Sequence, residues 1–142
     1  MAFKPNALTF QQGIDRIQNA LTAGKLKVGK KILVSKDLKV RKVLDSLQVS
    51  NVPGGFKKWQ LPVYMDGPSQ VFLSIGAPDV EVPAHSHEEG DGIRIIMGGS
   101  ILFEGMELTE GDWMFIPKGA PYSFKVGRGG VSMCYCYQCC CA

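Results

Sequence analysis

The two histidines of the chain lie in one short segment, residues 83 to 91, which also carries three carboxylates. In an extended strand, side chains two positions apart point to the same face, so His85 and His87 can direct both imidazoles to one point. Neutral imidazole nitrogens are good ligands for zinc, iron, copper or nickel, and a carboxylate adds a hard oxygen ligand. The composition therefore indicates a metal site. A solvated polar loop is the alternative that the segment alone leaves open.

The whole chain has the composition of one globular domain. It has 142 residues, of which 45% are hydrophobic and 20% charged, which is enough to bury a core. The first residues lack the apolar stretch of a signal peptide, and no run approaches the roughly 18 apolar residues of a membrane span. Five cysteines within the last nine residues form no distributed disulfide framework. We therefore predict a cytoplasmic protein without a membrane partner.

Charge divides the chain into two parts. Residues 1 to 58 contain twelve Lys or Arg against three acids, whereas residues 59 to 142 contain four against ten. A strong turn signal, Pro53-Gly54-Gly55, lies near this change, so we predict a basic N-terminal helical arm over residues 1–55 and a main body over 56–142. We expect the arm to dock on the acidic body of its own or a neighbouring subunit, as a homodimer.

The arm is predicted to contain two amphipathic helices. Thr9 and Gln12 resemble a capping box, after which apolar residues recur at helical spacing as far as Gly24, a suitable stop. A second apolar face follows Ser35 and ends near Ser50, and residues 25 to 34 form a short edge strand or irregular connector. About a dozen residues separate the helices, too many for a helix-turn-helix, so we expect no nucleic-acid partner.

The body is predicted to be an antiparallel β-domain. Short β-rich runs separated by Gly, Pro and Asp indicate a closed or double-sheet architecture. The expected strands are Trp59 to Met65, Gln70 to Gly76, Val80 to His87, Ile93 to Met97, Ser100 to Glu104, Asp112 to Pro117, Tyr122 to Val126 and Val131 to Tyr137, with turns that include Gly98-Gly99 and Gly127-Arg128-Gly129-Gly130.

Two segments of this region resemble the paired motifs of the cupin superfamily, a class of small β-barrel or jelly-roll domains. The first family motif reads His-x-His, three or four residues, Glu, six residues, Gly. Here His85 and His87 are followed, at the family spacing, by Asp91 in the Glu position. A second alignment takes Gly99 as the motif glycine, and Gly92 then falls at the Glu position.

The second family motif reads Gly, five residues, Pro, one residue, Gly, two residues, His, three residues, Asn. Gly111, Pro117 and Gly119 fit this pattern. Tyr122 stands where the family has its ligand His, and Val126 stands where it has Asn. The usual set of three His and one Glu ligands is therefore not carried over intact.

The resemblance implies a mainly β fold, a cupin-type antiparallel β-barrel or jelly roll behind an N-terminal two-helix arm. It also implies that the second motif lies beside the first, so that one pocket collects His85, His87, Tyr122 and a carboxylate from Asp91, Glu89 or Glu88. Two imidazoles and a carboxylate resemble the facial triad of non-haem Fe(II) sites. This predicts a divalent metal (iron, zinc, manganese or nickel) and an oxygenase, lyase or isomerase reaction on a small organic molecule.

Two other functions fit the same residues. Metal-independent epimerases and isomerases of the cupin superfamily use His as base and Tyr as acid on sugar-type substrates, and His85 or His87 with Tyr122 has those residue types. A sensor that binds a small ligand without turnover is the non-catalytic alternative, because a fold alone does not decide function.

The C-terminal thiols could bind a soft metal or become oxidised. However, Ser132, Cys134 and Cys136 alternate along a predicted strand and share one face, where cysteine often acts as a small buried hydrophobe. We therefore favour a structural role for this pair, and a terminal tail without metal for residues 139 to 141.

Overall fold

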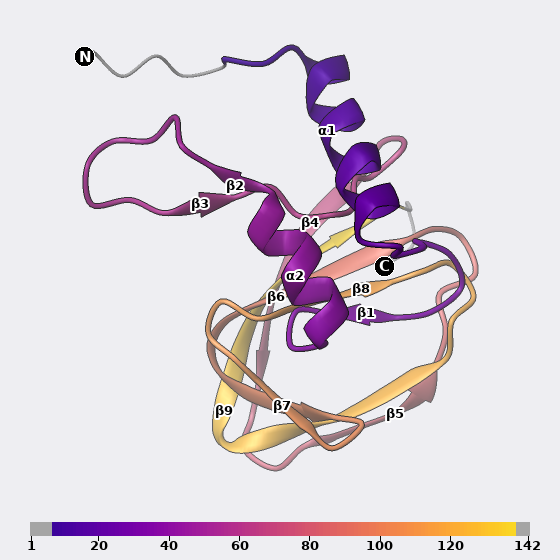
Figure 1. Ribbon diagram of the computed structural model, residues 1–142. Coiled ribbons are helices and arrows are strands. Elements are labelled where there is room, and N and C mark those ends of the chain that lie inside the picture. Colours follow the sequence, from indigo (N-terminus) through magenta and orange to yellow (C-terminus); the bar gives the residue numbers. More distant parts are fainter. Residues whose placement is uncertain (1–6, 139–142) are drawn as a thin grey trace. The chain divides into compact units, whose positions relative to one another are not determined.

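The computed structural model describes residues 7–138 of the chain, in two compact units. A helical unit comprises residues 7–28 and 37–64, and a sheet unit comprises residues 29–36 and 65–138 (Figure 1). The division differs from the sequence-based boundary at residue 55 in two ways. Residues 56–64 group with the helices, and residues 29–36 leave the predicted arm to join the sheet.

The helical unit begins with α1 (Phe10–Ala23). The Thr9 hydroxyl accepts from the Gln12 backbone N–H, while the Gln12 side chain accepts from the Thr9 N–H, which confirms the predicted capping box. Gly24 caps the other end, where its N–H donates to the carbonyl of Ala20. The apolar stripe of this helix buries Ile17.

The second helix, α2 (Leu38–Ser46), starts at Asp37, whose carboxylate accepts from two backbone N–H groups of the first turn. It ends four residues before the predicted Ser50, because the chain turns at Leu47 into the hairpin of β2 (Gln48–Val49) and β3 (Lys58–Trp59). The strand predicted for Trp59 to Met65 is wrong beyond Trp59.

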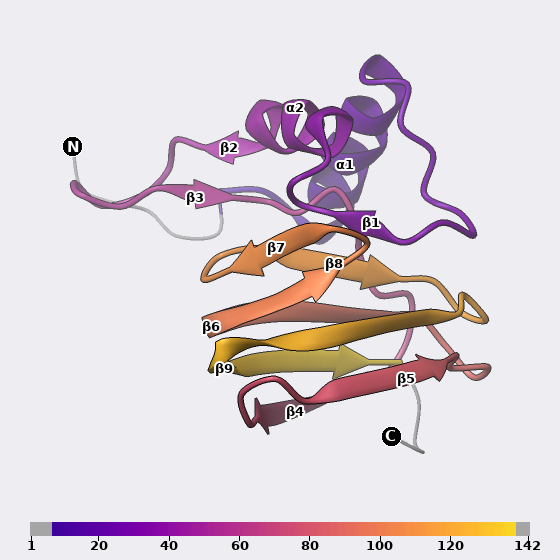
Figure 2. The same cartoon turned by 90° about the horizontal axis from the view of Figure 1, so that it is seen from below.

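The sheet unit is antiparallel, as predicted. Its strands are β1 (Leu33–Val34), β4 (Gln70–Gly76), β5 (Glu81–His85), β6 (Gly92–Phe103), β7 (Met106–Thr109), β8 (Trp113–Ile116) and β9 (Tyr122–Tyr137). One ladder runs β1-β8-β6-β9-β4, and β5 and β7 pair with the remaining halves of β9 and β6 (Figure 2). The two long strands thus take part in both layers of a jelly-roll arrangement.

Each long strand corrects a predicted turn. Gly98-Gly99 lies inside β6 and Gly127 to Gly130 lies inside β9, where the ladder between these two strands shifts register. Gly99 has φ +71°, and a Cβ on it would lie 2.0 Å from the Gly130 carbonyl oxygen. These glycines let the two strands bend together at close approach, so they continue the strands where the sequence pattern indicated reversals.

Strand β7 was not predicted. It follows a two-residue turn at Glu104-Gly105, where both residues have positive φ (47° and 76°), as a tight hairpin requires. The strand has four residues, and Glu107 faces solvent between its apolar positions, so its alternation was too short to recognise.

The core of the sheet unit lies between its two layers. It contains Val34, Ile96, Ile101, Phe103, Leu108, Met114, Ile116, Ala120, Tyr122, Phe124, Val126, Val131 and Met133. The buried Ser35 hydroxyl attaches the edge strand β1, since it donates to Asp112 at 2.8 Å and accepts from the Trp113 N–H at 3.0 Å. Within residues 7–138, no helix is long and apolar enough to cross a membrane.

Candidate functional site

Strand β5 ends at His85, two residues before the predicted His87, and both histidines lie on one side of the sheet unit. His85 is the register partner of Tyr122 at the start of β9, and their ring centroids are 4.5 Å apart. His87 follows two residues later, with its ring 5.1 Å from that of His85 and 6.1 Å from that of Tyr122. The predicted convergence of the three side chains is therefore present in the structure.

The Tyr122 hydroxyl is the centre of a hydrogen-bond network. Arg94 donates to it from Nε at 3.2 Å and from Nη2 at 3.0 Å, and His87 Nε2 lies 3.3 Å away. Because a guanidinium can only donate, the two Arg94 bonds occupy the lone pairs of the phenol oxygen. The phenol proton is then left to donate to His87, whose Nε2 must be unprotonated.

The charge state of His87 agrees with this assignment. Burial lowers the pKa of His87 below its ordinary value of 6.5, and the neighbouring His85 and Arg94 lower it further through like-charge repulsion. The imidazole is therefore neutral at pH 7 and available as a hydrogen-bond acceptor. His85 is oriented separately, because its Nδ1 lies 2.8 Å from the Pro83 carbonyl oxygen and, facing an acceptor, must carry the proton.

Aromatic rings form the wall behind these groups. Tyr135 and Tyr137 of β9 stack on each other at 5.6 Å, and the His87 ring lies 4.8 Å from that of Tyr137. The Arg94 guanidinium lies 4.0 Å from the centroid of the Tyr135 ring. Gly92 leaves room for that ring, since a Cβ at this position would lie 2.8 Å from Tyr135 Cε2.

The predicted carboxylates do not gather at the histidines. Asp91 accepts from the Lys118 backbone N–H at 2.8 Å, and Glu88 accepts from the Ser86 hydroxyl at 2.6 Å. Glu89 is exposed. Among residues 7–138, no group of three or more His, Cys, Asp or Glu side chains is placed to hold a metal ion.

Strand β6 explains why the pocket lacks a carboxylate. Alternate residues of a strand share a face, so Gly92, Arg94 and Ile96 all point toward the interior of the unit. The second alignment of the family motif places Gly92 at the Glu position, and the next inward side chain is Arg94. The pocket thus carries a positive group on the strand from which the family motif supplies a negative one.

Sequence reasoning missed three residues of this site: Arg94, Tyr135 and Tyr137. Arg94 had a signal, because it is the one charged residue within the run Gly92 to Phe103. The two tyrosines alternate with Cys134 and Cys136, which drew attention to the opposite face of the same strand. In both cases, the relevant partner lies on another strand and is distant in sequence.

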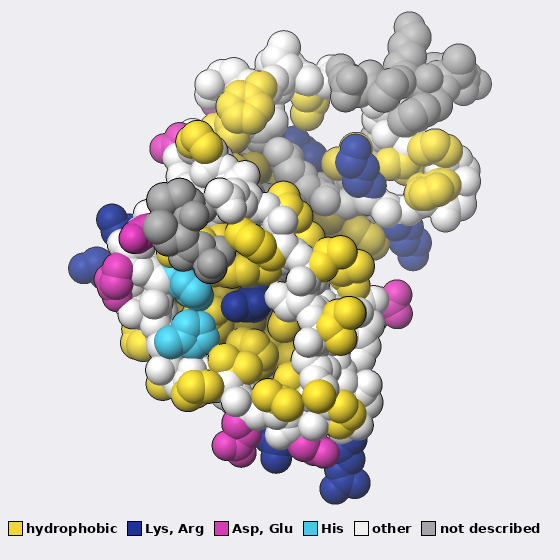
Figure 3. Space-filling model, turned by 180° about the vertical axis from the view of Figure 1, so that it is seen from behind, with side chains coloured by type: hydrophobic (Ala, Val, Ile, Leu, Met, Phe, Trp, Pro, Cys, Tyr) yellow, Lys and Arg dark blue, Asp and Glu magenta, His cyan; other side chains and the backbone are white. Residues whose placement is uncertain are grey.

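The molecular surface around the histidines is hollowed and largely apolar. Figure 3 shows both histidines (cyan) at the edge of this hollow, beside a basic side chain (dark blue) and a floor of hydrophobic groups. The ring of Phe124 lies 6.1 Å from that of Tyr122. A small molecule that enters here meets aromatic faces, two imidazoles and one guanidinium.

The cysteines that the structure describes occupy the other face of β9. Cys134 and Cys136 are free thiols that share one face, as predicted, but they are half-buried and not fully buried. Burial raises the pKa of the Cys136 thiol, and its neighbour Cys134 adds to this effect. Residues 139 to 141 lie outside the described residues.

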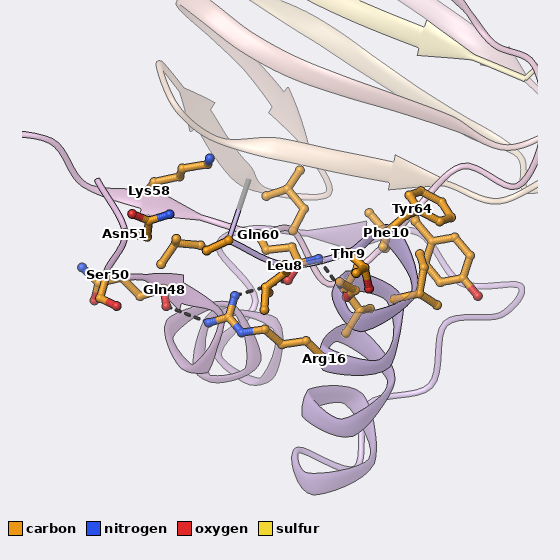
Figure 4. A pocket seen from close by; sticks show the side chains of 17 residues that line it. Leu8, Thr9, Phe10, Arg16, Gln48, Ser50, Asn51, Lys58, Gln60 and Tyr64 are labelled. Atoms are coloured by element: carbon orange, nitrogen blue, oxygen red, sulfur yellow. Dashed lines mark hydrogen bonds between the residues drawn. The ribbon is translucent and has the colours of Figure 1, made fainter. Parts of the chain in front are cut away.

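A second hollow, of about 690 Å³, is formed by the helical unit. It is lined by α1, the β2–β3 hairpin and the segment after β3, and Figure 4 shows Arg16 and Gln60 at its centre. Arg16 donates to the Gln48 carbonyl oxygen at 2.7 Å and to Gln60 Oε1 at 3.3 Å. These bonds attach the hairpin to α1, so Arg16 has a structural role.

Comparison with protein-family models found no match, and comparison with curated proteins found none either. Solved structures do resemble the chain. A protein of unknown function with a cupin-like fold from Ralstonia eutropha is 19% identical, with a TM-score of 0.45 over 50% of this chain and 47% of that chain. A cupin protein from Bacteroides fragilis is 24% identical, with a TM-score of 0.42 over 55% of this chain and 68% of its own.

RmlC from Streptococcus suis, solved in complex with dTDP-D-xylose, is 17% identical, with a TM-score of 0.45 over 52% of this chain and 45% of that chain. At such identities the likeness concerns the fold alone. The sheet unit shares a mainly antiparallel β architecture with these cupin structures. Its antiparallel order and its two long shared strands agree with the prediction made from the paired motifs. In this chain, the first cupin-like segment supplies the two histidines, and the second supplies Tyr122.

Proposed function

We propose that this cupin binds a small organic molecule beside His85, His87 and Tyr122 and catalyses a metal-independent proton transfer, as in an isomerase or epimerase. The observation that carries the proposal is the Tyr122 hydroxyl, which contacts a neutral imidazole on one side and a guanidinium on the other. This is an arrangement for moving a proton at a defined atom.

The reaction assigns one role to each group. With Nδ1 protonated against Pro83, His85 has a free lone pair on Nε2 and serves as the base that takes a proton from a carbon next to a carbonyl. Tyr122 gives its hydroxyl proton to the same carbon. Arg94 donates two N–H groups to the resulting Tyr122 phenolate. A proton then returns to Tyr122 through His87, and His85 releases its proton to solvent.

Solvent deuterium exchange tests this reaction. Keto sugars and 2-oxo acids are incubated with the protein in D2O and a metal chelator, and proton NMR follows the carbon-bound hydrogens. We expect exchange with the wild type, loss of exchange in His85→Gln and Tyr122→Phe, and normal exchange in Tyr64→Phe, a control in the helical unit. Exchange that disappears with chelator contradicts the proposal, and thermal stabilisation by a compound without exchange favours the sensor function.

Metal binding by His85 and His87 is the second candidate. The contact of His85 Nδ1 with a carbonyl oxygen favours it, because metal-bound histidines usually donate their other ring N–H in this way. However, the described residues fit a divalent ion poorly. Among them, no carboxylate joins the two imidazoles, and the positive charge of Arg94 lies beside Tyr122.

Elemental analysis of protein purified without an affinity tag tests the metal prediction. A stoichiometric divalent metal that is lost in His85→Ala/His87→Ala would establish the site and favour the oxygenase or lyase reaction. Equal metal content in the wild type and the double variant excludes it. A Cys139→Ser/Cys140→Ser/Cys141→Ser variant distinguishes metal bound by the C-terminal thiols from metal bound by the two histidines.

We also propose a homodimer, formed through strand β4. This strand is an edge of the described ladder, and its sequence, residues 70–76, contains no charged side chain. Val71, Leu73 and Ile75 share one face and are 67%, 76% and 88% exposed. An uncharged apolar edge strand is a template for pairing. Two copies related by a two-fold axis would pair β4 with β4 and place the two stripes side by side.

A further inference from the structure

Arg94 is a buried cation without a matching anion. Its side chain is 9% exposed, and among residues 7–138 no Asp or Glu forms an ion pair with it. Its partners are aromatic: the Tyr135 ring at 4.0 Å, the Phe124 ring at 5.6 Å and the Tyr122 hydroxyl. Ring faces compensate a buried guanidinium only in part, because they carry no negative charge to replace the water that burial removes.

The guanidinium has donors to spare. Of the five N–H groups of an arginine, the Tyr122 oxygen accepts one from Nε and one from Nη2, so three remain for a ligand. Stacking on Tyr135 holds the planar fork in one orientation. A fixed fork with free donors matches the geometry of a carboxylate or a phosphate.

Among residues 7–138, no other side chain of the pocket is placed to neutralise this charge. His87 is neutral at pH 7, Gly92 has no side chain to offer, and the Asp91 carboxylate accepts from the Lys118 N–H. The region beside Tyr122 is therefore electropositive and bordered by aromatic rings. A low local dielectric strengthens the attraction for an incoming anion.

We infer that Arg94 binds the carboxylate group of the ligand, and that this site takes small planar organic acids. This inference rests on the proposed function, and it names the substrate class of the same pocket. The stacked Tyr135 and Tyr137 rings favour a flat, unsaturated molecule over inorganic phosphate. A carboxylate on Arg94 also places the adjoining carbon next to Tyr122, which already lies 3.0 Å from Nη2.

Binding of simple probes tests the inference without any turnover. Benzoate, pyruvate, benzamide and inorganic phosphate are titrated into the full chain, with NMR of the arginine Nε–H and histidine ring signals and calorimetry for affinity. We expect benzoate or pyruvate to shift the Arg94 and His87 signals. We also expect benzamide, a neutral isostere, to bind at least about tenfold more weakly than benzoate.

Matched variants identify the anchoring residue. Arg94→Gln should weaken carboxylate binding by at least about tenfold, and Arg94→Lys should restore part of it, because it keeps the charge and loses the fork. Arg128→Gln, an exposed site on the same sheet unit, should leave binding unchanged. If Arg94→Gln does not fold, the comparison of benzoate with benzamide on the wild type still tests whether binding depends on the carboxylate.

Three results would overturn the inference: equal affinity for benzoate and benzamide, unchanged carboxylate binding in Arg94→Gln, or no signal change at Arg94 with either carboxylate. Phosphate that binds more tightly than both carboxylates would replace the organic acid with a phosphate ester. Carboxylate binding without deuterium exchange would contradict the proton-transfer function and leave the role of Arg94 intact. The two proposals can thus fail separately.

Discussion

Replacement of Tyr122 by Phe removes one oxygen atom from the centre of the candidate site. That oxygen accepts two N–H groups of Arg94 at 3.0 and 3.2 Å and contacts His87 Nε2 at 3.3 Å. Tyr122 is 4% exposed, so the ring itself stays packed in the variant. The substitution therefore isolates the hydrogen bonds from the hydrophobic contacts of the side chain.

The expected loss of stability follows from these contacts. A hydrogen bond to a charged group contributes about 1.5–3 kcal/mol, and the two bonds from one guanidinium to one oxygen act as a single unit. His87 is half-buried and can turn to water, so its contribution is smaller. We expect Tyr122→Phe to lower the free energy of unfolding by about 2–3 kcal/mol, which corresponds to a fall of roughly 6–15 °C in Tm for a chain of this size.

Urea unfolding followed by circular dichroism measures this difference, with Tyr64→Phe as the control. Tyr64 is 41% exposed and belongs to the helical unit, so its hydroxyl should contribute less than about 0.5 kcal/mol. Benzoate should restore part of the lost stability, because it offers Arg94 a new acceptor. If Tyr122→Phe is as stable as Tyr64→Phe, the guanidinium does not depend on the phenol, and the network has been misassigned.

Three further predictions concern pH, packing and assembly. Because the pKa of His87 is lowered in the folded state, the unfolded chain binds more protons just below pH 6.5. The free energy of unfolding should therefore be highest above pH 6.5 and should fall as the pH drops below it. Urea midpoints measured across this range should fall less in His87→Gln than in the wild type. Gly92→Ala should cost about 1–3 kcal/mol, since its Cβ would lie 2.8 Å from the nearest ring atom, whereas Gly129→Ala, with nothing within 4 Å, should be neutral in thermal unfolding. Leu73→Glu should convert the proposed dimer to a monomer in light scattering, and Leu102→Glu, 45% exposed on β6, should not; a wild type that is already monomeric would rule out the β4 interface.

Local patterns predicted the parts of the fold that depend on short stretches of sequence. The capping box at Thr9 located α1, and the spacing of His85 and His87 predicted that two imidazoles lie close together, although the strand ends at His85. The same approach failed at Gly98-Gly99, because a glycine pair looks alike whether the chain reverses or bends within a strand. Only the approach of β9 to 2.0 Å from the missing Cβ of Gly99 distinguishes the two cases.

The composition of the pocket was decided by the tertiary structure. The resemblance of two segments to cupin motifs predicted that two histidines and a tyrosine would meet, with Tyr122 in the place of the ligand histidine. Which side chains complete the set depends on the register of β6 against β9, which pairs Arg94 with Tyr135 across 41 positions of the chain. A register shift of one residue moves every inward side chain of a strand to the outward face. In the observed register, Arg94 faces Tyr122, and the Asp91 carboxylate accepts from the Lys118 N–H. The pocket therefore contains a positive group and not the predicted negative one.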